Sequence, residues 1–527
     1  MAFIDIVTNN LSRDLTNSVT ASDNWVYVPG TAITGDYSKP LLFTSLSDFQ
    51  DTCGTRSPEG SNTYEYVAGL LNAGLPVIFR RIACKNQDGE GETLGVEQAF
   101  AEFSHEVPND EEPENPKVVK DFIVKEKYGG TFGNDLYITI RYPGSAVWID
   151  VILDKTLIER KRIATITAND EGNTEVINAK VIKGLKTIEF DRIEITDIND
   201  DPATFSITPK DRVPLSGGKD FPEKDVVGEI AYSYRFIRDK MLYQPKFITS
   251  GGYTDDTTDG SWPIATAMKN LTLQRQDCRA IIDLPLCTPK SDYSTHAASL
   301  SYNQYTSSTE IPSASMYAPW AYMRIGSDTI WMPPSYVFLT TLGNRLLEGK
   351  QPYNPVAGLS TGIVRNIVKT EFEIGSDTAE EWQSDTEVNI NPIMKMNGST
   401  YVIGGNSTLL VPEEETGETN IFLESSADLT VIDIRRFVYN LATELQYQYN
   451  SVVAFENFGL RTSEYLNRMI SEGAVIDYAI YNESTDTDPR TLKIRLDVYI
   501  SPTIKKIQIT LNVGYGSIEI DTEGGNG

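Results

Sequence analysis

The spacing of apolar residues along the chain predicts alternating strands and helices, which is typical of an α/β protein. Residues 25–28 and 76–79 read as buried strands, and residues 63–72 as a helix that Gly74 ends. The same alternation returns after Gly218. There it predicts, in order, a helix near 226–240, a strand at 246–249, a helix near 264–275 and a strand at 280–283. We therefore expect one α/β domain that the intervening residues interrupt.

The interrupting block, residues 86–214, has a different character. It opens with an acidic, proline-punctuated loop at 109–116 and continues with strand-like runs at 136–140 and 147–152. Insertions of this kind usually sit on an exposed loop of the host domain. The pattern thus predicts an inserted β-rich domain that faces outward.

The carboxyl-terminal part predicts two helices followed by strands. Thr430 and Asp433 have the spacing of a capping box ahead of a long helix. That helix has one apolar stripe at helical spacing: Ile434, Val438, Leu441, Leu445 and Val452. A second helix is expected between a cap at Thr462 and a stop at Gly473. Three strands then follow, at 475–481, 492–500 and 507–513, and strict alternation in the last two predicts one buried and one solvent-facing side.

Both ends of the chain carry short apolar runs without an evident partner. Residues 3–7 precede a polar stretch at 8–23, and residues 517–520 follow a link that contains Gly514 and Gly516. A strand without an intramolecular partner is either part of a disordered tail or a donor to the sheet edge of another molecule. The pattern by itself leaves both interpretations open.

Composition narrows the classes of function. The chain has 46 basic and 74 acidic residues, a net charge of −28, which disfavours binding to nucleic acid phosphates. It contains no apolar span long enough for a membrane helix, and residues 1–6 lack the basic region of a signal peptide. The four cysteines are widely spaced, without a C-x-x-C pattern, and we interpret them as free thiols.

No catalytic, cofactor or metal site is predicted. His105 and His296 lie in different regions without a companion at ligand spacing. Asp255, Asp259 and Gly260 match part of a calcium loop, but the bidentate acid at its last position is missing. The segment 216–220 lacks the spacing of a phosphate loop and is interpreted as a turn at a domain boundary.

Several motifs, in their order along the chain, resemble those of contractile bacteriophage tail sheath proteins, a family shared with tailocins and related injection devices. They are Lys39-Pro40-Leu41-Leu42-Phe43-Thr44-Ser45-Leu46, Phe132-Gly133-Asn134-Asp135-Leu136, Arg275-Gln276-Asp277-Cys278-Arg279-Ala280-Ile281-Ile282-Asp283-Leu284-Pro285, Ala318-Pro319-Trp320 with Pro333-Pro334-Ser335, and Asp433-Ile434-Arg435-Arg436-Phe437. The segment 404–408 departs from the family, because the aromatic and the Arg of that turn are missing. The likeness covers nearly the whole chain apart from the inserted block.

The resemblance implies a multidomain α+β or α/β fold, with a sheath core built from both chain ends, an inserted outer domain and two linking arms. On this reading the chain divides as follows: an N-terminal arm at 1–22, a discontinuous α/β domain at 23–85 and 215–350, a β-rich outer domain at 86–214, a C-terminal core at 351–513 with a tube-facing helix and a sheet, and a C-terminal arm at 514–527.

The resemblance also implies a function without catalysis. Subunits would polymerise helically around a tail tube, as hexameric rings, and contract to drive the tube through a host envelope. The implied partners are further copies of the chain, the tube protein, and baseplate and terminator proteins, with no cofactor, nucleic acid or membrane. The implied location is the virion, after assembly in the host cytoplasm. The sheath of a tailocin-type injection device remains an alternative, as do an adhesin or carbohydrate-binding virion protein and a hydrolase that works with acidic side chains.

The resemblance assigns roles to particular residues. The linking strands would be formed by Phe3, Ile4, Ile6, Val7, Ile518 and Ile520. The acceptor sheet would be formed by Leu492, Ile494, Leu496, Val498, Ile507, Ile509 and Leu511. Arg435 and Arg436 are candidates for contact with acidic groups of the tube.

Overall fold

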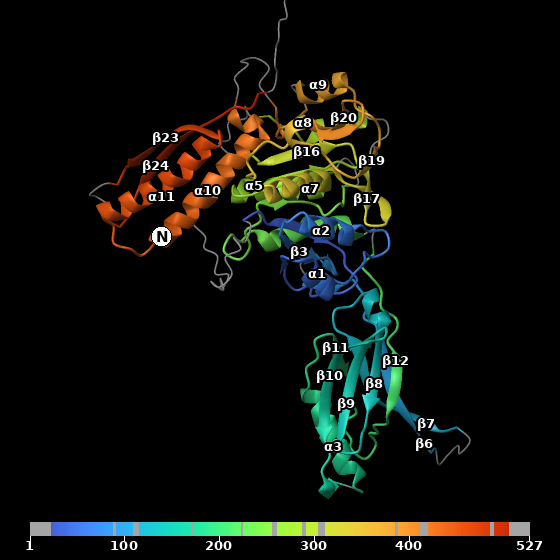
Figure 1. Ribbon diagram of the computed structural model, residues 1–527. Helices are drawn as coiled ribbons and strands as arrows, with labels where there is room; N and C mark the ends of the chain where they lie inside the picture. Colours follow the sequence, from blue (N-terminus) through green and yellow to red (C-terminus); the bar gives the residue numbers. More distant parts are fainter. Residues whose placement is uncertain are drawn as a thin grey trace, which may run out of the picture.

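The computed structural model describes residues 23–87, 91–108, 115–170, 172–222, 225–255, 261–286, 291–303, 311–384, 388–411, 420–484 and 490–504. Figure 1 shows three parts: a central α/β body, a long helical arm formed by the carboxyl-terminal residues, and a β-rich domain that projects from the body on its own. No helix within these residues is long and apolar enough to cross a membrane.

The central body is built on a mixed sheet with the strand order β2-β3-β1-β13-β14-β16-β20-β21. The inner strands are parallel, and the two edge strands, β2 and β21, run antiparallel to their neighbours. The strands are β1 (Val26–Gly30), β2 (Leu41–Phe43), β3 (Val77–Arg81), β13 (Phe247–Ile248), β14 (Arg279–Asp283), β16 (Ala314–Ala318), β20 (Ile390–Met396) and β21 (Thr400–Ile403).

Helices cover both faces of this sheet, which explains its continuous apolar strands. Val26 and Val28 pack into one face with α2 (Thr63–Asn72) and α7 (Pro334–Leu347). Tyr27, between them in sequence, packs into the opposite face with α4 (Val226–Ser233) and α5 (Pro263–Arg275). The remaining helices of the body are α1 (Leu46–Cys53), α6 (Ser291–Leu300), α8 (Gly358–Thr361) and α9 (Ser376–Ser384). The alternating strands and helices expected from the sequence thus form a three-layer body.

The sheet continues beyond residue 350, where the sequence analysis placed a domain boundary. Met316 of β16 pairs with Ile390 of β20, and Met394 of β20 pairs with Val402 of β21. The boundary at 350 therefore cuts through one sheet. A short apolar run such as Ile390–Met396 does not show which strand it will pair with, because the partner strand lies far away in the sequence.

Smaller sheets complete the body. One is antiparallel, with the order β18-β17-β19, formed by β17 (Ala321–Ile325), β18 (Asp328–Met332) and β19 (Ile367–Thr370). Two pairs are formed by β4 (Cys84–Gln87) with β5 (Gly91–Leu94), and by β15 (Tyr302–Asn303) with β22 (Leu410–Val411).

The projecting domain contains a four-stranded sheet, β10-β9-β8-β12, and a three-stranded sheet, β11-β7-β6, with the helix α3 (Thr174–Thr187). Its strands are β6 (Phe100–Val107), β7 (Lys117–Glu126), β8 (Leu136–Arg141), β9 (Ala146–Leu153), β10 (Thr156–Thr165), β11 (Ile193–Thr196) and β12 (Lys210–Pro214). Its apolar core is separate from those of the body. Gly184 lets α3 approach β10 closely, because a Cβ there would lie 2.0 Å from the carbonyl oxygen of Ile163.

A buried arginine holds the projecting domain to the body. The Arg81 guanidinium donates to the carbonyl oxygens of Ala32 (3.1 Å) and Gly35 (2.7 Å) in the body. It also donates to those of Tyr128 (2.8 Å) and Gly129 (2.6 Å), which follow β7 of the projecting domain. Arg81 is 1% exposed, and its hydrogen bonds to Ala32, Gly35 and Gly129 are buried, so these three carbonyl groups depend on it as their donor. The joint between the body and the projecting domain is therefore held by polar contacts and is not a flexible linker.

The carboxyl-terminal arm consists of α10 (Ser425–Leu445), α11 (Val452–Ser471), β23 (Val475–Asn482) and β24 (Ile494–Ile500). The predicted capping box is wrong: α10 begins earlier, and Thr430 and Asp433 are buried inside it. The predicted cap at Thr462 is wrong as well, because Ser451 caps α11 through the backbone N–H of Ala454. Gly473 lies just past the end of α11 with φ of 80°, as the sequence predicts.

Candidate assembly surface

The outer end of the arm carries a two-stranded antiparallel sheet, where the sequence analysis expected the acceptor. β23 pairs with β24 from Val475 and Ile500 to Asn482 and Ile494. Leu496 and Val498 of β24 pack against the core, whereas Arg495 and Tyr499 are exposed. Leu492 lies just before β24. The predicted alternation is therefore present in β24, with its apolar side turned toward the helices.

Within the described residues, this sheet has no third strand. Each of the two strands therefore leaves one row of backbone N–H and C=O groups without a ladder partner in that part of the chain. An isolated hairpin is only marginally stable in water. Here α11 supports it, since Leu466 and Met469 of α11 and Val475 of β23 are buried together.

Further contacts fix the arm around the hairpin. The rings of Phe437 on α10 and Tyr465 on α11 stack with centroids 4.0 Å apart and planes 3° from parallel. After β24 the chain returns to the beginning of α10, where Glu424 accepts hydrogen bonds from Thr503 N (2.9 Å) and Oγ1 (2.8 Å). The hairpin is thus held at both ends, by α11 before it and by Glu424 after it.

The other predicted linking and acceptor positions fall outside the described residues. They are Phe3, Ile4, Ile6, Val7, Ile507, Ile509, Leu511, Ile518 and Ile520.

A buried polar seam attaches the arm to the central sheet. Lys246 precedes β13, Arg279 begins β14 and Ser313 precedes β16, so all three lie at the amino-terminal edge of the parallel strands. Arg279 donates to Asp428 on α10 at 2.6 Å and to the carbonyl oxygen of Ser425 at 3.2 Å. The Ser313 hydroxyl also donates to Asp428. The first turn of α10 is therefore bound to two neighbouring strands.

One and a half turns further along α10, a second ion pair repeats this arrangement. The Nζ of Lys246 lies 2.6 Å from Oδ1 of Asp433, and both side chains are buried. Burial lowers the pKa of Lys246, because the charged ammonium is removed from water, and the Asp433 carboxylate offsets part of that effect. Two buried pairs on one helix fix both its position and its rotation against the sheet.

The two arginines proposed to face a tube differ in their surroundings. Arg436 is half-buried and donates to carbonyl oxygens of its own chain, at Gln244 (3.1 Å), Pro245 (3.3 Å) and Asp277 (3.2 Å). Arg435 is exposed and has one long hydrogen bond, 3.3 Å to the carbonyl oxygen of Gln276. Arg436 thus extends the seam, while Arg435 is available to a partner.

The seam was not predicted from the sequence. Its signal was present, because Lys246 and Arg279 each stand immediately before a run of buried strand residues. A charge at the start of a buried strand is costly unless it is paired, so it indicates a carboxylate partner elsewhere in the fold. The sequence does not say that the partners are Asp428 and Asp433, about 150 and 190 residues further along.

The opposite, carboxyl-terminal edge of the sheet is where doubly wound folds bind ligands, at the point where the strand order reverses. Here that point lies between β1 and β13. The Tyr253 hydroxyl occupies it, 2.8 Å from Thr31 Oγ1 and 2.9 Å from Ser61 Oγ. Beside it, Asp283 accepts from the backbone N–H (2.7 Å) and the hydroxyl (2.5 Å) of Ser335 at the start of α7. The chain's own side chains therefore fill this edge.

The weak calcium and metal motifs have structural explanations within the described residues. Asp255 accepts from the backbone N–H groups of Ile264 (2.7 Å) and Ala265 (3.1 Å), so it caps α5. His105 lies 2.8 Å from Asp121, and His296 packs edge-on against Trp262. In the part of the chain that the structure describes, no three His, Cys, Asp or Glu side chains gather at metal-binding distance.

Solved structures share the fold of this chain. A sheath tail protein from Listeria innocua superposes with a TM-score of 0.59 at 12% identity, over 91% of this chain and 92% of that one. The chain has the sheath tail protein fold. A second sheath tail protein, from Desulfitobacterium hafniense, gives a TM-score of 0.54 at 11% identity, over 92% of this chain and 94% of that one. No protein-family model matches the sequence, and no curated protein matches it.

Proposed function

We propose that this chain is a structural subunit of a contractile tail sheath, in which neighbouring copies are linked by strand exchange. The observation that carries the proposal is the β23–β24 sheet, which α11 and Glu424 hold in place on the arm and which is separate from the eight-stranded sheet of the body. The sheath tail protein fold, present over nine-tenths of the chain, supports it.

In this proposal the apolar runs at the chain ends are the donors. Phe3, Ile4, Ile6 and Val7 of one copy, and Ile518 and Ile520 of another, add strands to the β23–β24 sheet of a third copy, beside the strand that the sequence predicts at 507–513. Strand addition forms main-chain hydrogen bonds along the whole edge, so the link survives while the bodies move relative to one another. The length of chain that this movement requires is supplied by the polar stretch at 8–23 and by the link that contains Gly514 and Gly516.

The proposal extends to the rest of the assembly, as the resemblance to sheath proteins implies. The α10 side faces a tail tube, with the exposed Arg435 toward acidic groups of the tube protein, and the projecting domain faces outward. Rings of the subunit, six to a ring, stack between baseplate and terminator proteins, and contraction moves the tube through a host envelope. No catalysis is involved, and the assembly belongs to a virion or to a tailocin-type device.

Electron microscopy tests the donor assignment. The full chain, negatively stained, is expected to form rings or tubes, and a chain without residues 1–22 is expected to stay monomeric. A double variant, Ile4→Asp with Ile6→Asp, should behave like the truncation because it places two charges on one face of the donated strand. The matched control shortens the β6–β7 loop at 109–114 and should assemble normally. Normal assembly of the chain lacking residues 1–22 would contradict the proposal.

A further inference from the structure

The small sheet β18-β17-β19 has one face in the core and one face in solvent. Ala321, Met323 and Met332 are buried against the central body. The alternate residues point away from it, as successive side chains of a strand must. A solvent face of this kind normally carries small polar side chains.

This outer face instead carries an aromatic and cationic row. Trp331, Tyr322 and Lys369 are cross-strand partners in one line across the three strands. The rings of Tyr322 and Trp331 lie 5.2 Å apart, and Nζ of Lys369 lies 5.4 and 5.5 Å from the two ring centres. Arg324, two residues after Tyr322, points to the same side and is exposed. We call these four residues the platform.

The platform lies in a basic part of an acidic chain. Between residues 321 and 370 there are five basic and two acidic residues, whereas the whole chain has a net charge of −28. Neither Arg324 nor Lys369 forms an ion pair within the described residues. Copies of such an acidic chain repel one another at long range, so a local positive surface is where a second copy can approach.

A complementary surface lies on the arm. Glu456, Leu460 and Glu464 follow one another at four-residue spacing along the outer side of α11, and all three are exposed. Leu460 is 63% exposed and lies between the two carboxylates. Within the described part of the chain, neither glutamate forms an ion pair. We call these residues the acidic row.

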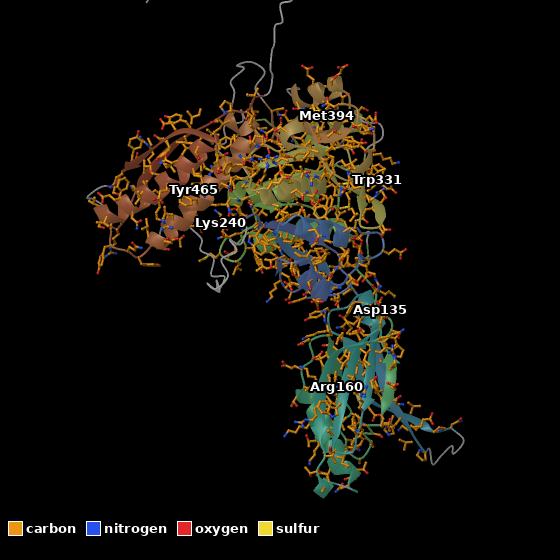
Figure 2. The ribbon with its side chains drawn as sticks, in the orientation of Figure 1. Asp135, Arg160, Lys240, Trp331, Met394 and Tyr465 are labelled. Carbon is orange, nitrogen blue, oxygen red and sulfur yellow. The ribbon has the colours of Figure 1, made fainter. Side chains whose placement is uncertain are left out.

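The two surfaces lie on opposite sides of the molecule, the platform on the body and the acidic row on the arm. In Figure 1 the strand β17 and the helix α11 lie on opposite sides, and in Figure 2 Trp331 and Tyr465 of α11 are labelled on these two sides. They cannot meet within one molecule. Two different surfaces that fit each other at opposite ends produce a head-to-tail contact, and repeated contacts of this kind close a ring or build a helix.

We propose that the platform of one copy docks on the acidic row of the next, with Leu460 against the rings of Tyr322 and Trp331. Arg324 and Lys369 pair with Glu456 and Glu464. This contact rests on the proposed sheath function, which it deepens by naming a body-to-arm interface distinct from the exchanged strands.

Charge reversal and its compensation test the contact. The full-length double variant Arg324→Glu with Lys369→Glu should raise the critical concentration for assembly, measured by sedimentation, about tenfold. Glu456→Lys with Glu464→Lys should do the same, and an equimolar mixture or the quadruple variant should assemble like the unmodified chain. The control, Lys155→Glu with Lys183→Glu, makes the same change in net charge at exposed sites of the projecting domain and should have little effect. An equal effect of the control, or no rescue in the quadruple variant, overturns the proposal.

Cross-linking gives a readout that does not require tubes. A Thr329→Cys chain, whose new thiol lies on the platform side opposite Arg324, is mixed under oxidising conditions with a Leu460→Cys chain. A disulfide-linked heterodimer is expected in the mixture, and no disulfide-linked dimer is expected when either variant is oxidised alone. If the unmodified chain forms no rings or tubes but the heterodimer appears, the sheath function fails and the interface stands. If tubes form and the heterodimer does not, the interface is wrong and the sheath function stands.

Discussion

The guanidinium of Arg279, at the start of β14, lies 2.6 Å from the carboxylate of Asp428 in the first turn of α10, and both are buried. With Lys246 and Asp433 nearby, this pair makes the arm a rigid extension of the central sheet rather than a tethered appendage. A force applied to the β23–β24 hairpin is therefore transmitted to the body through buried polar contacts and shared apolar packing.

Removing one partner of this pair should loosen the arm. Asp428→Asn leaves the buried Arg279 charge without compensation and is expected to lower the free energy of unfolding by roughly 3–5 kcal/mol. Chemical denaturation measures this loss, and limited proteolysis should show faster cleavage near the start of α10. The control is Glu444→Gln, which like Asp428 lies on α10. It removes an exposed ion pair with Arg461 of α11 and should cost at most about 1 kcal/mol. Similar losses in the two variants would contradict the role given to the seam.

The joint of the projecting domain gives a second comparison. Arg81→Met leaves three buried carbonyl oxygens and one part-buried carbonyl oxygen without this donor and should destabilise the chain by roughly 3 kcal/mol or more. Small-angle scattering should also show a wider range of domain orientations. Arg56 bridges the same joint through an exposed pair with Asp135 at 3.1 Å, so Arg56→Ala should change both quantities little. An unchanged scattering curve for Arg81→Met would mean that apolar packing alone fixes the joint.

Stability should depend on pH through Asp283. Burial raises the pKa of this carboxyl from 3.8 to about 6, and hydrogen bonds from Ser335 offset part of the effect. At a pH between 3.8 and about 6, Asp283 is protonated in the folded chain and ionised in the unfolded chain. This group's contribution to the free energy of unfolding therefore decreases as pH rises through that window, by roughly 3 kcal/mol, and is constant above it.

Asp283→Asn isolates this contribution, because its side-chain oxygen still accepts from the Ser335 N–H but does not titrate. The difference in unfolding free energy between the two chains, measured by urea denaturation from pH 4 to 7, should change across the window and then level off. A constant difference over that range would show that Asp283 does not titrate there.

Two cysteines should be inert in the folded chain. Burial raises the pKa of the Cys53 and Cys278 thiols to about 12, because the charged thiolate would be removed from water. A thiol reagent at pH 8, followed by peptide mapping, should leave both unmodified until denaturant is added. Rapid labelling of either one in the native chain would indicate local opening of the core that contains it.

The local elements were largely predictable from the sequence, because each depends on neighbouring residues. The helix at Thr63–Asn72 has the predicted bounds, and the alternation in Ile494–Ile500 identified β24 with its buried side. Helix beginnings were less well predicted. Thr430 and Thr462 carry capping side chains, yet both are inside helices, since packing against the core extends α10 and α11 beyond the local signal.

The sequence by itself determined the periods of the strands and helices, the acidic charge, and the apolar runs at the two ends of the chain. Tertiary structure alone decided that β20 joins β16, that Arg279 and Lys246 find Asp428 and Asp433, and that the platform and the acidic row lie at opposite ends of the molecule. These relationships join residues tens to hundreds of positions apart. They are fixed by the pairing of distant strands in one sheet and by the burial of charges against it, and no local pattern encodes either.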